Sequence, residues 1–419
     1  MFGSGMLSFL VLLLAISVLA RQTPLFLLSL ALLVAALLSR LWERYCLTGV
    51  EYRRRFSHQR ASFGDEVVME IEIINRKILP LSWLEIEDEM PRDLPPKQGR
   101  VYASHKAERA VLPNFLPLKP YERVRRRYVL PCVTRGEHRF GPVRLRSGDL
   151  FGFISCERNI ELPESLVVYP RVVPVAQLGL PSRYPVGELR TQSWIFEDVS
   201  RVAGAREYRP GDSLRRIHWA ATARTGELQS RVYEATTSHR LALFLNLDTN
   251  ETPGWGFGYD PDVLEFTITA AASLASWALE RGYQIGVYTN GMHRWVRGAV
   301  SVEPARDSGQ LERILVALGR LEPITALRFE LLLDGRARKL PFGSTAVIIT
   351  STLRQPVVAA IRAVRHGTPT TVILTGRRPS QVTIPGVTIR RAGPPESWRE
   401  IQSIAPTIDV AGPQGTING

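Results

Sequence analysis

The densest cluster of residues able to do chemistry lies between Ala205 and Gly226. Pro210 and Gly211 predict a turn, and Asp212 follows at a position where an N-cap residue would begin a short helix. Guanidinium groups are planar forks that match carboxylates, so the arginines here could bind an acidic partner or pair with acidic neighbours inside the segment. The candidate residues are Arg206, Glu207, Tyr208, Gly211, Asp212, Arg215, Arg216, Trp219 and Arg224.

Two apolar residues of this segment, Ile217 and Trp219, are expected to be buried while the arginines stay outside. Residue chemistry alone favours an internal salt-bridge network over a partner-binding surface, because clustered charges often perturb one another without forming a site. If Trp219 is buried, replacing it with alanine should destabilise the fold by about 3–5 kcal/mol. Arg215→Ala and Arg216→Ala should leave the melting temperature nearly unchanged but weaken partner binding.

The sequence lacks the common motifs of enzymes. It has no Gly-x-x-x-x-Gly-Lys-Ser/Thr loop, no His-Glu-x-x-His and no Gly-x-Ser-x-Gly. Its three cysteines form no Cys-x-x-Cys pair, are too few for a disulfide framework and fit a reducing compartment. We therefore expect no catalytic residues and a binding protein rather than an enzyme.

Two apolar runs at the start of the chain, 7–20 and 25–38, are separated by a turn with Arg21 and Pro24. A bilayer span needs about 20 apolar residues, and both runs are a little short. Because they lie back to back and would be helical to satisfy their own backbone groups, they predict a transmembrane α-hairpin that contacts lipid over residues 6–39. A cleaved signal peptide is the alternative, but no Lys or Arg precedes the first run.

Arginines crowd the exit of the second run, whereas the turn between the runs has only one. The positive-inside rule then places both termini and the bulk of the chain in the cytoplasm, with two spans in the cytoplasmic membrane. The arginines at the exit are Arg40, Arg44, Arg53, Arg54, Arg55 and Arg60.

The middle of the chain has a hydrophobic period of two. Residues 66–74 alternate polar and apolar side chains, and further short runs are separated by Gly or Pro, which predicts an immunoglobulin-like β-sandwich. Arg123, Arg125 and Arg127 share one face of a strand. A solvated sheet face is the simpler interpretation of this stripe, and a surface for an anion or a partner is the other.

The last part of the chain alternates apolar runs with helical spacing. Residues 241–247 are typical of a strand buried on both faces, and residues 262–281 have the spacing of a helix that stops at Gly282. This alternation predicts a mostly parallel, doubly wound α/β sheet. The expected domains are a helical hairpin (1–45), the sandwich (46–175), a linker with the arginine-rich segment (176–235), the α/β domain (236–405) and a flexible tail (406–419).

The run from Arg206 to Gly226 resembles the signature of the bacterial family named domain of unknown function fifty-eight (DUF58). Residues 135–143 and 148–152 are similar to the β-region of that family, although most relatives would have proline where Leu150 stands. The resemblance covers nearly the whole chain. It implies a von Willebrand factor A-like domain at the C-terminus and, by association, AAA-type ATPases of the MoxR kind as partners. It implies no established reaction.

A von Willebrand A metal site begins Asp-x-Ser-x-Ser after the first strand of the sheet, and here Asp248, Asn250 and Thr252 stand at those places. Their oxygen atoms suit a hard cation such as Mg²⁺. A later Asp is also expected, but the sequence has Ser351 and Thr352 instead. One carboxylate with neutral oxygens makes a weak site, and the alternative is that Asp248 caps a helix or holds its loop.

The 419 residues carry a net charge of +13, which raises nucleic acid, anionic lipid or an acidic protein as partners. The excess is concentrated in residues 40–60, 121–146 and 201–231, which favours local contacts over a nucleic-acid coat. The leading hypothesis is a membrane-anchored, cytosol-facing protein-interaction scaffold that works with a MoxR-type AAA ATPase. A divalent-cation-dependent von Willebrand A-type binder is the alternative, and a nucleic-acid binder ranks below both.

Overall fold

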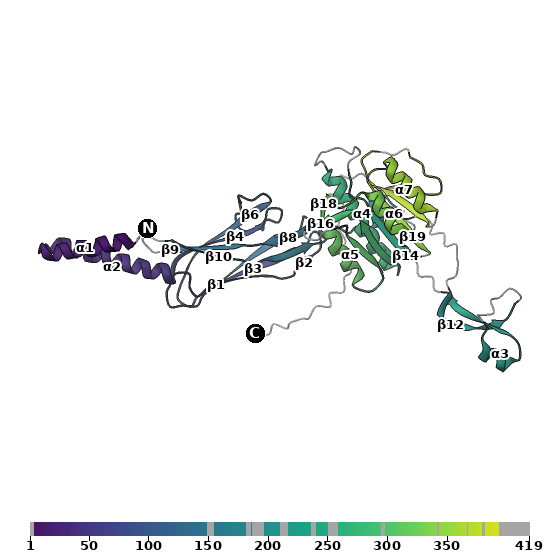
Figure 1. The fold of residues 1–419 in the computed structure, drawn as a ribbon, viewed down its shortest axis with the longest axis horizontal. Helices are drawn as coiled ribbons and strands as arrows, with labels where there is room; N and C mark the ends of the chain where they lie inside the picture. Colours follow the sequence, from purple (N-terminus) through teal and green to yellow (C-terminus); the bar gives the residue numbers. More distant parts are fainter. Residues whose placement is uncertain are drawn as a thin grey trace. The chain divides into compact units, whose positions relative to one another are not determined.

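The computed structural model divides the chain into two compact units, Met1–Tyr169 and Pro170–Gly419. Along the chain, a pair of helices comes first, then a strand-rich region, a small hairpin and a mixed α/β region (Figure 1). The structure describes residues 4–148, 155–181, 186, 197–209, 217–235, 240–249, 259–294, 298–341, 343–366, 368–378 and 382–393. The tail predicted at 406–419 lies outside these residues.

Two helices begin the first unit, α1 (Ser4–Leu19) and α2 (Thr23–Tyr45), and they pack against each other (Figure 1). Pro24 lies in the first turn of α2, where a missing backbone N–H breaks no helical hydrogen bond. Inside the contact, the hydroxyl oxygens of Ser17 and Ser29 lie 3.5 Å apart. The apolar runs of the sequence therefore form a helical pair, as their composition predicts.

The prediction that these helices span a membrane is wrong. No helix in the described residues is long and apolar enough to cross one. The 16 residues of α1 extend about 24 Å at about 1.5 Å per residue, against a hydrocarbon core of about 30 Å. The 23 residues of α2 include Arg40, Glu43 and Arg44, which shorten its apolar stretch. Because the predicted spans are wrong, the predicted location in the cytoplasmic membrane is wrong as well.

The strands described in the first unit form three sheets, so the two-sheet immunoglobulin-like sandwich is also wrong. The first has the order β1 (Val50–Phe56), β3 (Glu66–Asn75), β7 (Arg123–Pro131). The second has the order β10 (Ser155–Ile160), β9 (Val143–Gly148), β4 (Leu81–Pro91), β6 (Arg109–Leu118), β5 (Tyr102–Ala103). The third has the order β2 (Arg60–Ala61), β11 (Glu164–Val168), β8 (Gly136–Phe140).

The third sheet forms because β11 pairs in parallel with β2 and antiparallel with β8. A period of two shows that a segment is a strand but not which strand lies beside it, so the sequence could not predict this arrangement. The alternation does place one face of each strand in the core. Met69, Ile71 and Ile73 of β3 and Ile86 of β4 are fully buried there.

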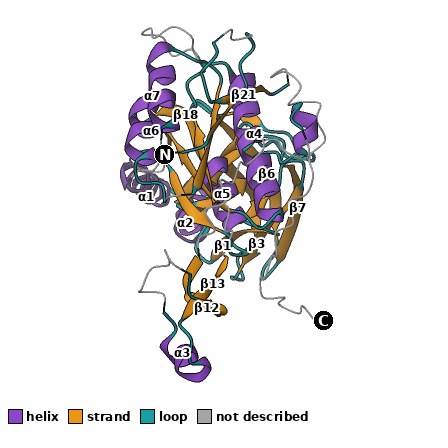
Figure 2. Cartoon of the chain, turned by 90° about the vertical axis from the view of Figure 1, so that its right-hand side faces the viewer, coloured by secondary structure: helices purple, strands orange, loops and turns teal. Residues whose placement is uncertain are grey.

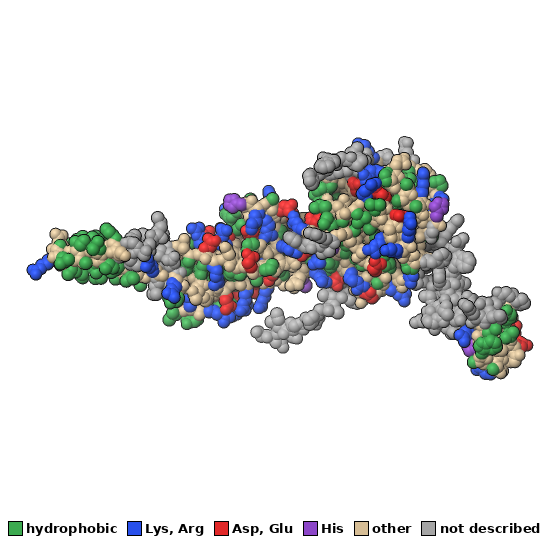
Figure 3. Space-filling model, viewed as in Figure 1, with side chains coloured by type: hydrophobic (Ala, Val, Ile, Leu, Met, Phe, Trp, Pro, Cys, Tyr) green, Lys and Arg blue, Asp and Glu red, His purple; other side chains and the backbone are tan. Residues whose placement is uncertain are grey.

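The arginine stripe of β7 pairs with the carboxylates of its neighbour β3. Arg125 Nε lies 2.9 Å from Glu72 Oε1, and Arg127 Nε lies 2.9 Å from Glu70 Oε2. Arg123 Nε is 3.5 Å from the same Glu72 oxygen. Over this unit, blue and red side chains alternate in Figure 3. The stripe is thus a solvated face of cross-strand ion pairs, and its positive charge is largely matched by the neighbouring strand.

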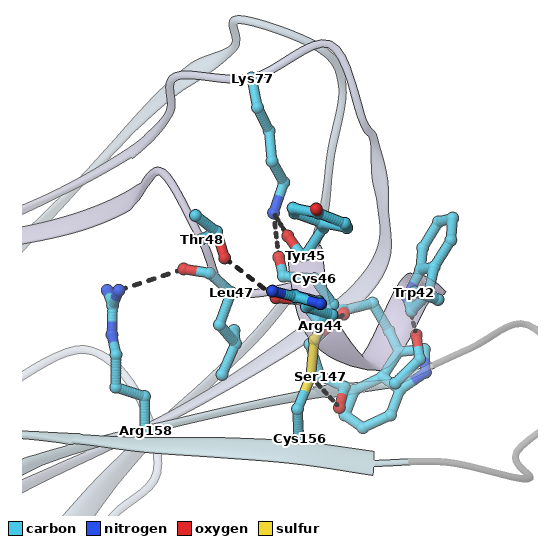
Figure 4. The surroundings of a disulfide bond; sticks show 12 residues. Trp42, Arg44, Tyr45, Cys46, Leu47, Thr48, Lys77, Ser147, Cys156 and Arg158 are labelled. Atoms are coloured by element: carbon cyan, nitrogen blue, oxygen red, sulfur yellow. Dashed lines mark hydrogen bonds between the residues drawn. A yellow bond between two sulfur atoms is a disulfide. The ribbon is translucent and has the colours of Figure 1, made fainter. Parts of the chain in front are cut away.

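A disulfide joins Cys46, at the end of α2, to Cys156 on β10 (Figure 4). Three cysteines are too few for a disulfide framework, but two of them form this single bond. The sequence did not predict it, because the two residues are 110 positions apart and their spacing carries no signal. Trp42 Nε1 donates to the carbonyl oxygen of Gly148 at 2.9 Å beside it. The end of α2 is thus attached to β9 and β10. Disulfides persist in oxidising compartments, so the cysteines no longer favour a reducing one.

Two cations bind the carbonyl groups at the end of α2. Lys77 Nζ donates to the carbonyl oxygen of Tyr45 at 2.7 Å and also to that of Cys46, while Arg158 Nη1 donates to that of Leu47 at 3.1 Å (Figure 4). Burial, with repulsion from Arg158, lowers the pKa of Lys77 to about 8. Positive groups are favourable at this position because the last carbonyls of a helix lack internal partners.

The second unit contains a mixed six-stranded sheet. The central strands run parallel, and β17 at one edge is antiparallel. The order is β17 (Ser301–Ala305), β15 (Gln284–Thr289), β14 (Arg240–Leu245), β19 (Ser344–Thr350), β20 (Thr370–Leu374), β21 (Thr388–Arg391). Beside it lie a small sheet of β16 (Gly291–His293) and β18 (Leu321–Thr325) and the 3-10 turn η1 (Val175–Leu178). The C-terminal region is therefore mixed α/β, as its alternating pattern predicts.

Helices pack on both faces of this sheet (Figure 2). Phe244 and Ile348 belong to the buried cluster under α6 and α7. Because successive strand side chains point to opposite faces, Leu243 and Leu245 lie on the other face, where α4 packs. The helices are α4 (Pro261–Glu280), α5 (Gln310–Gly319), α6 (Phe329–Ala337) and α7 (Gln355–Arg365).

Candidate functional site

The arginine-rich segment forms a small antiparallel hairpin of β12 (Glu197–Glu207) and β13 (Gln229–Ala235), with the helix α3 (Trp219–Thr225) ahead of β13. We call these three elements the signature hairpin. Glu207 pairs with Gln229 in its ladder. The helix ends at Gly226, whose φ of 76° is left-handed and favours glycine.

The N-terminus of α3 is capped by His218, whose Nδ1 accepts a hydrogen bond from the backbone N–H of Ala221 at 3.2 Å. The cap predicted at Asp212 lies outside the described residues, as do Gly211, Arg215 and Arg216. Ser, Thr, Asp and Asn are the usual N-caps, so a histidine gave no signal in the sequence.

Trp219 is 67% exposed, so the prediction that it is buried is wrong. Ile217 is 6% exposed, as predicted, and pairs with Ser230 of β13 through a β-bridge. The physical reason is that two strands and one short helix provide too little surface to cover both side chains. The large destabilisation expected for Trp219→Ala therefore does not apply, because its condition was burial of the ring.

Charged and apolar side chains are mixed around Trp219 on the signature hairpin. Leu228 is 46% exposed, and its carbonyl oxygen accepts from the backbone N–H of the half-buried Tyr208 at 2.8 Å. Figure 3 shows apolar side chains on this hairpin beside basic and acidic ones. The exposed charged residues described here are Arg206, Glu207, Arg209, Arg224 and Glu227.

A second candidate site lies at the carboxyl ends of β14 and β19, where a buried polar network fixes Asp248. Asn246 Nδ2 donates to Thr350 Oγ1 at 3.0 Å, and Asn246 Oδ1 accepts from Asn290 Nδ2 at 3.0 Å and from the backbone N–H of Asp248 at 3.1 Å. Ser351 Oγ donates to the carbonyl oxygen of Asp248 at 2.8 Å. Ligands of such sheets bind at this edge, so the position of Asp248 suits binding.

The residues at this edge do not fit a magnesium site. Arg354 Nη2 contacts Asp248 Oδ2, and the two side chains are 25% and 27% exposed. A cation on that oxygen would have to displace the guanidinium. The other predicted ligands, Asn250 and Thr252, lie outside the described residues. Where the structure is described, no group of three or more His, Cys, Asp or Glu side chains could hold a metal ion.

Another arginine pairs with the acidic residues at the start of α4. Arg377 Nε lies 2.6 Å from Asp260 Oδ2, and Arg377 Nη2 lies 3.3 Å from Asp262 Oδ2. Asp260 Oδ1 also accepts from the backbone N–H groups of Asp262 and Val263, which makes Asp260 the N-cap of α4. The hydrogen bond from Arg377 and the backbone bond from Val263 lower the pKa of Asp260.

The first unit contains a buried charge network around Arg54, which was expected to lie at a membrane exit. Its Nη1 donates to Asp88 Oδ1 at 2.5 Å, its Nε to Glu164 Oε2 at 2.8 Å and its Nη2 to the carbonyl oxygen of Leu162 at 2.8 Å. Tyr52 Oη donates to Asp88 Oδ2 at 2.7 Å. Burial raises the pKa values of Asp88 and Tyr52. Because Arg54 and Asp88 are closed to solvent, this network is structural.

Comparisons with solved structures give no argument about the fold. The sporulation control protein Spo0M from Bacillus subtilis is 12% identical, covering 29% of this chain and 49% of that one, with a TM-score of 0.17. A β-glucosidase from Listeria innocua in complex with glucose is also 12% identical, covering 28% of this chain and 16% of that one, with a TM-score of 0.18.

Comparison at the level of sequence is more informative. The uncharacterized protein YeaD of Bacillus subtilis (strain 168) is 27% identical over 265 residues, which are 63% of this chain and 62% of that protein. The match thus spans less than two thirds of the relative's length. The family described as "Protein of unknown function DUF58" matches residues 204–397, which include α3, β13 and the whole mixed sheet. Over those residues, the chain is similar to the DUF58 family.

Proposed function

We propose that the protein is a non-enzymatic interaction module that works with a MoxR-type AAA ATPase and docks it through the signature hairpin. The observation that carries this proposal is the exposure of Trp219, at 67% of its surface. Tryptophan and arginine are the residues most enriched among those that dominate binding energy at protein interfaces. The indole ring of Trp219 is exposed to water on this small hairpin, and an apolar pocket on a partner would bury it.

The surroundings of Trp219 indicate the chemistry of the partner surface. Leu228 adds a second exposed apolar side chain to the hairpin. Arg224, in the last turn of α3, is exposed. We therefore infer that the ATPase presents an apolar pocket for the indole ring with carboxylates at its rim, where guanidinium groups bind carboxylates bidentately.

The distribution of charge favours this function over nucleic-acid binding. Proteins bind phosphate backbones through continuous basic surfaces, and this binding releases the counterions condensed on the nucleic acid. The basic stripe of β7 is instead matched by Glu70 and Glu72 of β3. On β9, Arg144 and Arg146 similarly lie 3.4 and 3.9 Å from carboxylates of β4.

A pull-down with purified proteins tests the proposal. The full chain should retain a MoxR-type ATPase, and the Trp219→Ala variant should lose it. Tyr259→Ala is the matched control, because Tyr259 is an aromatic residue of the second unit that is 47% exposed but lies outside the hairpin. Equal retention by the wild type and both variants would contradict docking through Trp219.

A further inference from the structure

Arginine side chains of the chain itself neutralise the carboxylates at the carboxyl edge of the sheet. Arg354 binds Asp248, and Arg377 binds both Asp260 and Asp262. Asp248 follows β14, and Asp260 and Asp262 lie at the start of α4. Asp260 is further engaged as the N-cap of α4.

We propose that Arg354 takes the place of a divalent cation at this edge and keeps such a cation out. The guanidinium occupies the carboxylate oxygen of Asp248 that a metal ion would need. A Mg²⁺ ion prefers several charged oxygens and gives up its water reluctantly, so a single aspartate that is already paired competes poorly for it. The inference is independent of docking through Trp219.

Both partners of this pair are held by rigid elements. Asp248 is fixed from the side of β14 by Asn246 and from the side of β19 by Ser351. Arg354 is the N-cap of α7, and its carbonyl oxygen accepts the helical hydrogen bond of Val358 at 2.9 Å. The backbones of both residues are therefore fixed, and forming the pair orders only one long side chain, that of Arg354.

Thermal melting of the full chain, with MnCl₂ or with EDTA, tests the proposal. The wild type should melt at the same temperature in both. Arg354→Ala should melt about 2–4 °C higher with manganese than with EDTA, as expected for a ligand at about ten times its Kd. Adding Asp248→Ala to that variant should abolish the rise.

Arg328→Ala is the matched control, since Arg328 is the N-cap of α6 and pairs with Glu330 away from this edge. It should behave like the wild type. If Arg354→Ala does not fold, Arg354→Gln removes the charge while keeping most of the side chain. A manganese-dependent rise in the wild type that Asp248→Ala abolishes would overturn the proposal. So would a folded Arg354 variant that gains no manganese response.

Discussion

Arg54 and Asp88 form an ion pair that is closed to solvent, with 2.5 Å between Arg54 Nη1 and Asp88 Oδ1 and at most 1% of either side chain exposed. The pair joins β1 to β4, and Arg54 also reaches Glu164 at the start of β11. Arg54 Nη2 donates to the carbonyl oxygen of Leu162, and Asp88 Oδ2 accepts from Tyr52 Oη. The two charges are therefore compensated by hydrogen bonds as well as by each other. Burying an ion pair is tolerable only when its groups are satisfied in this way.

Arg54→Ala should lower the free energy of unfolding by about 3–5 kcal/mol, because it leaves the Asp88 carboxylate buried without its cation. Urea unfolding of the full chain measures this loss. The neighbouring Arg53→Ala provides the control, since Arg53 pairs with Glu51 where the two side chains are 44% and 35% exposed. Such a surface pair contributes about 0–1 kcal/mol. Equal losses for the two variants would show that the buried pair has no special role.

Reduction of the disulfide between Cys46 and Cys156 should destabilise the first unit, because the bond closes a segment with a sequence separation of 110. The expected loss is about 2–5 kcal/mol, measured by urea unfolding with and without a thiol reductant. The double variant Cys46→Ser/Cys156→Ser should be destabilised to the same extent and be insensitive to reductant. Loss of stability in that double variant on adding reductant would place the effect elsewhere, since Cys132 is the remaining cysteine.

Asp260 should contribute to the acid stability of the second unit. Arg377 lowers its pKa in the folded protein, so its contribution is fully present above the unfolded pKa of about 3.9 and is lost as the pH falls through the folded value. Arg377→Gln should therefore reduce stability at neutral pH and flatten its decline on acidification. Unfolding free energies at neutral pH and at about pH 3 measure the difference. An unchanged pH dependence in Arg377→Gln would contradict the assignment.

The sequence predicted the mixed α/β region because buried parallel strands are continuous apolar runs, as in 241–247, and because 262–281 has a clear helical period. It did not predict the short helix α6 or the antiparallel direction of the edge strand β17. Exposed edge strands and short helices have weak periodicity. The membrane question depended on the helix bounds, since α1 has only 16 residues and α2 includes three charged residues near its end.

The sequence could not predict which distant residues pair with each other. Arg354 is 106 positions from Asp248, and Arg54 is 34 positions from Asp88. Nothing in the type of an arginine distinguishes one that faces solvent from one enclosed by carboxylates. Trp219 shows the converse. An aromatic residue two positions from the apolar Ile217 was expected to be buried with it, but the small hairpin leaves the ring exposed.

The affinity of the full chain for a MoxR-type ATPase, measured by titration calorimetry for the wild type and Trp219→Ala, tests the central claim most directly. The account predicts that the variant binds at least about 30-fold more weakly, since loss of an interface hot spot costs about 2 kcal/mol or more. Its melting temperature should equal that of the wild type, because the indole ring is exposed. Wild-type affinity in a normally folded Trp219→Ala variant would contradict the account.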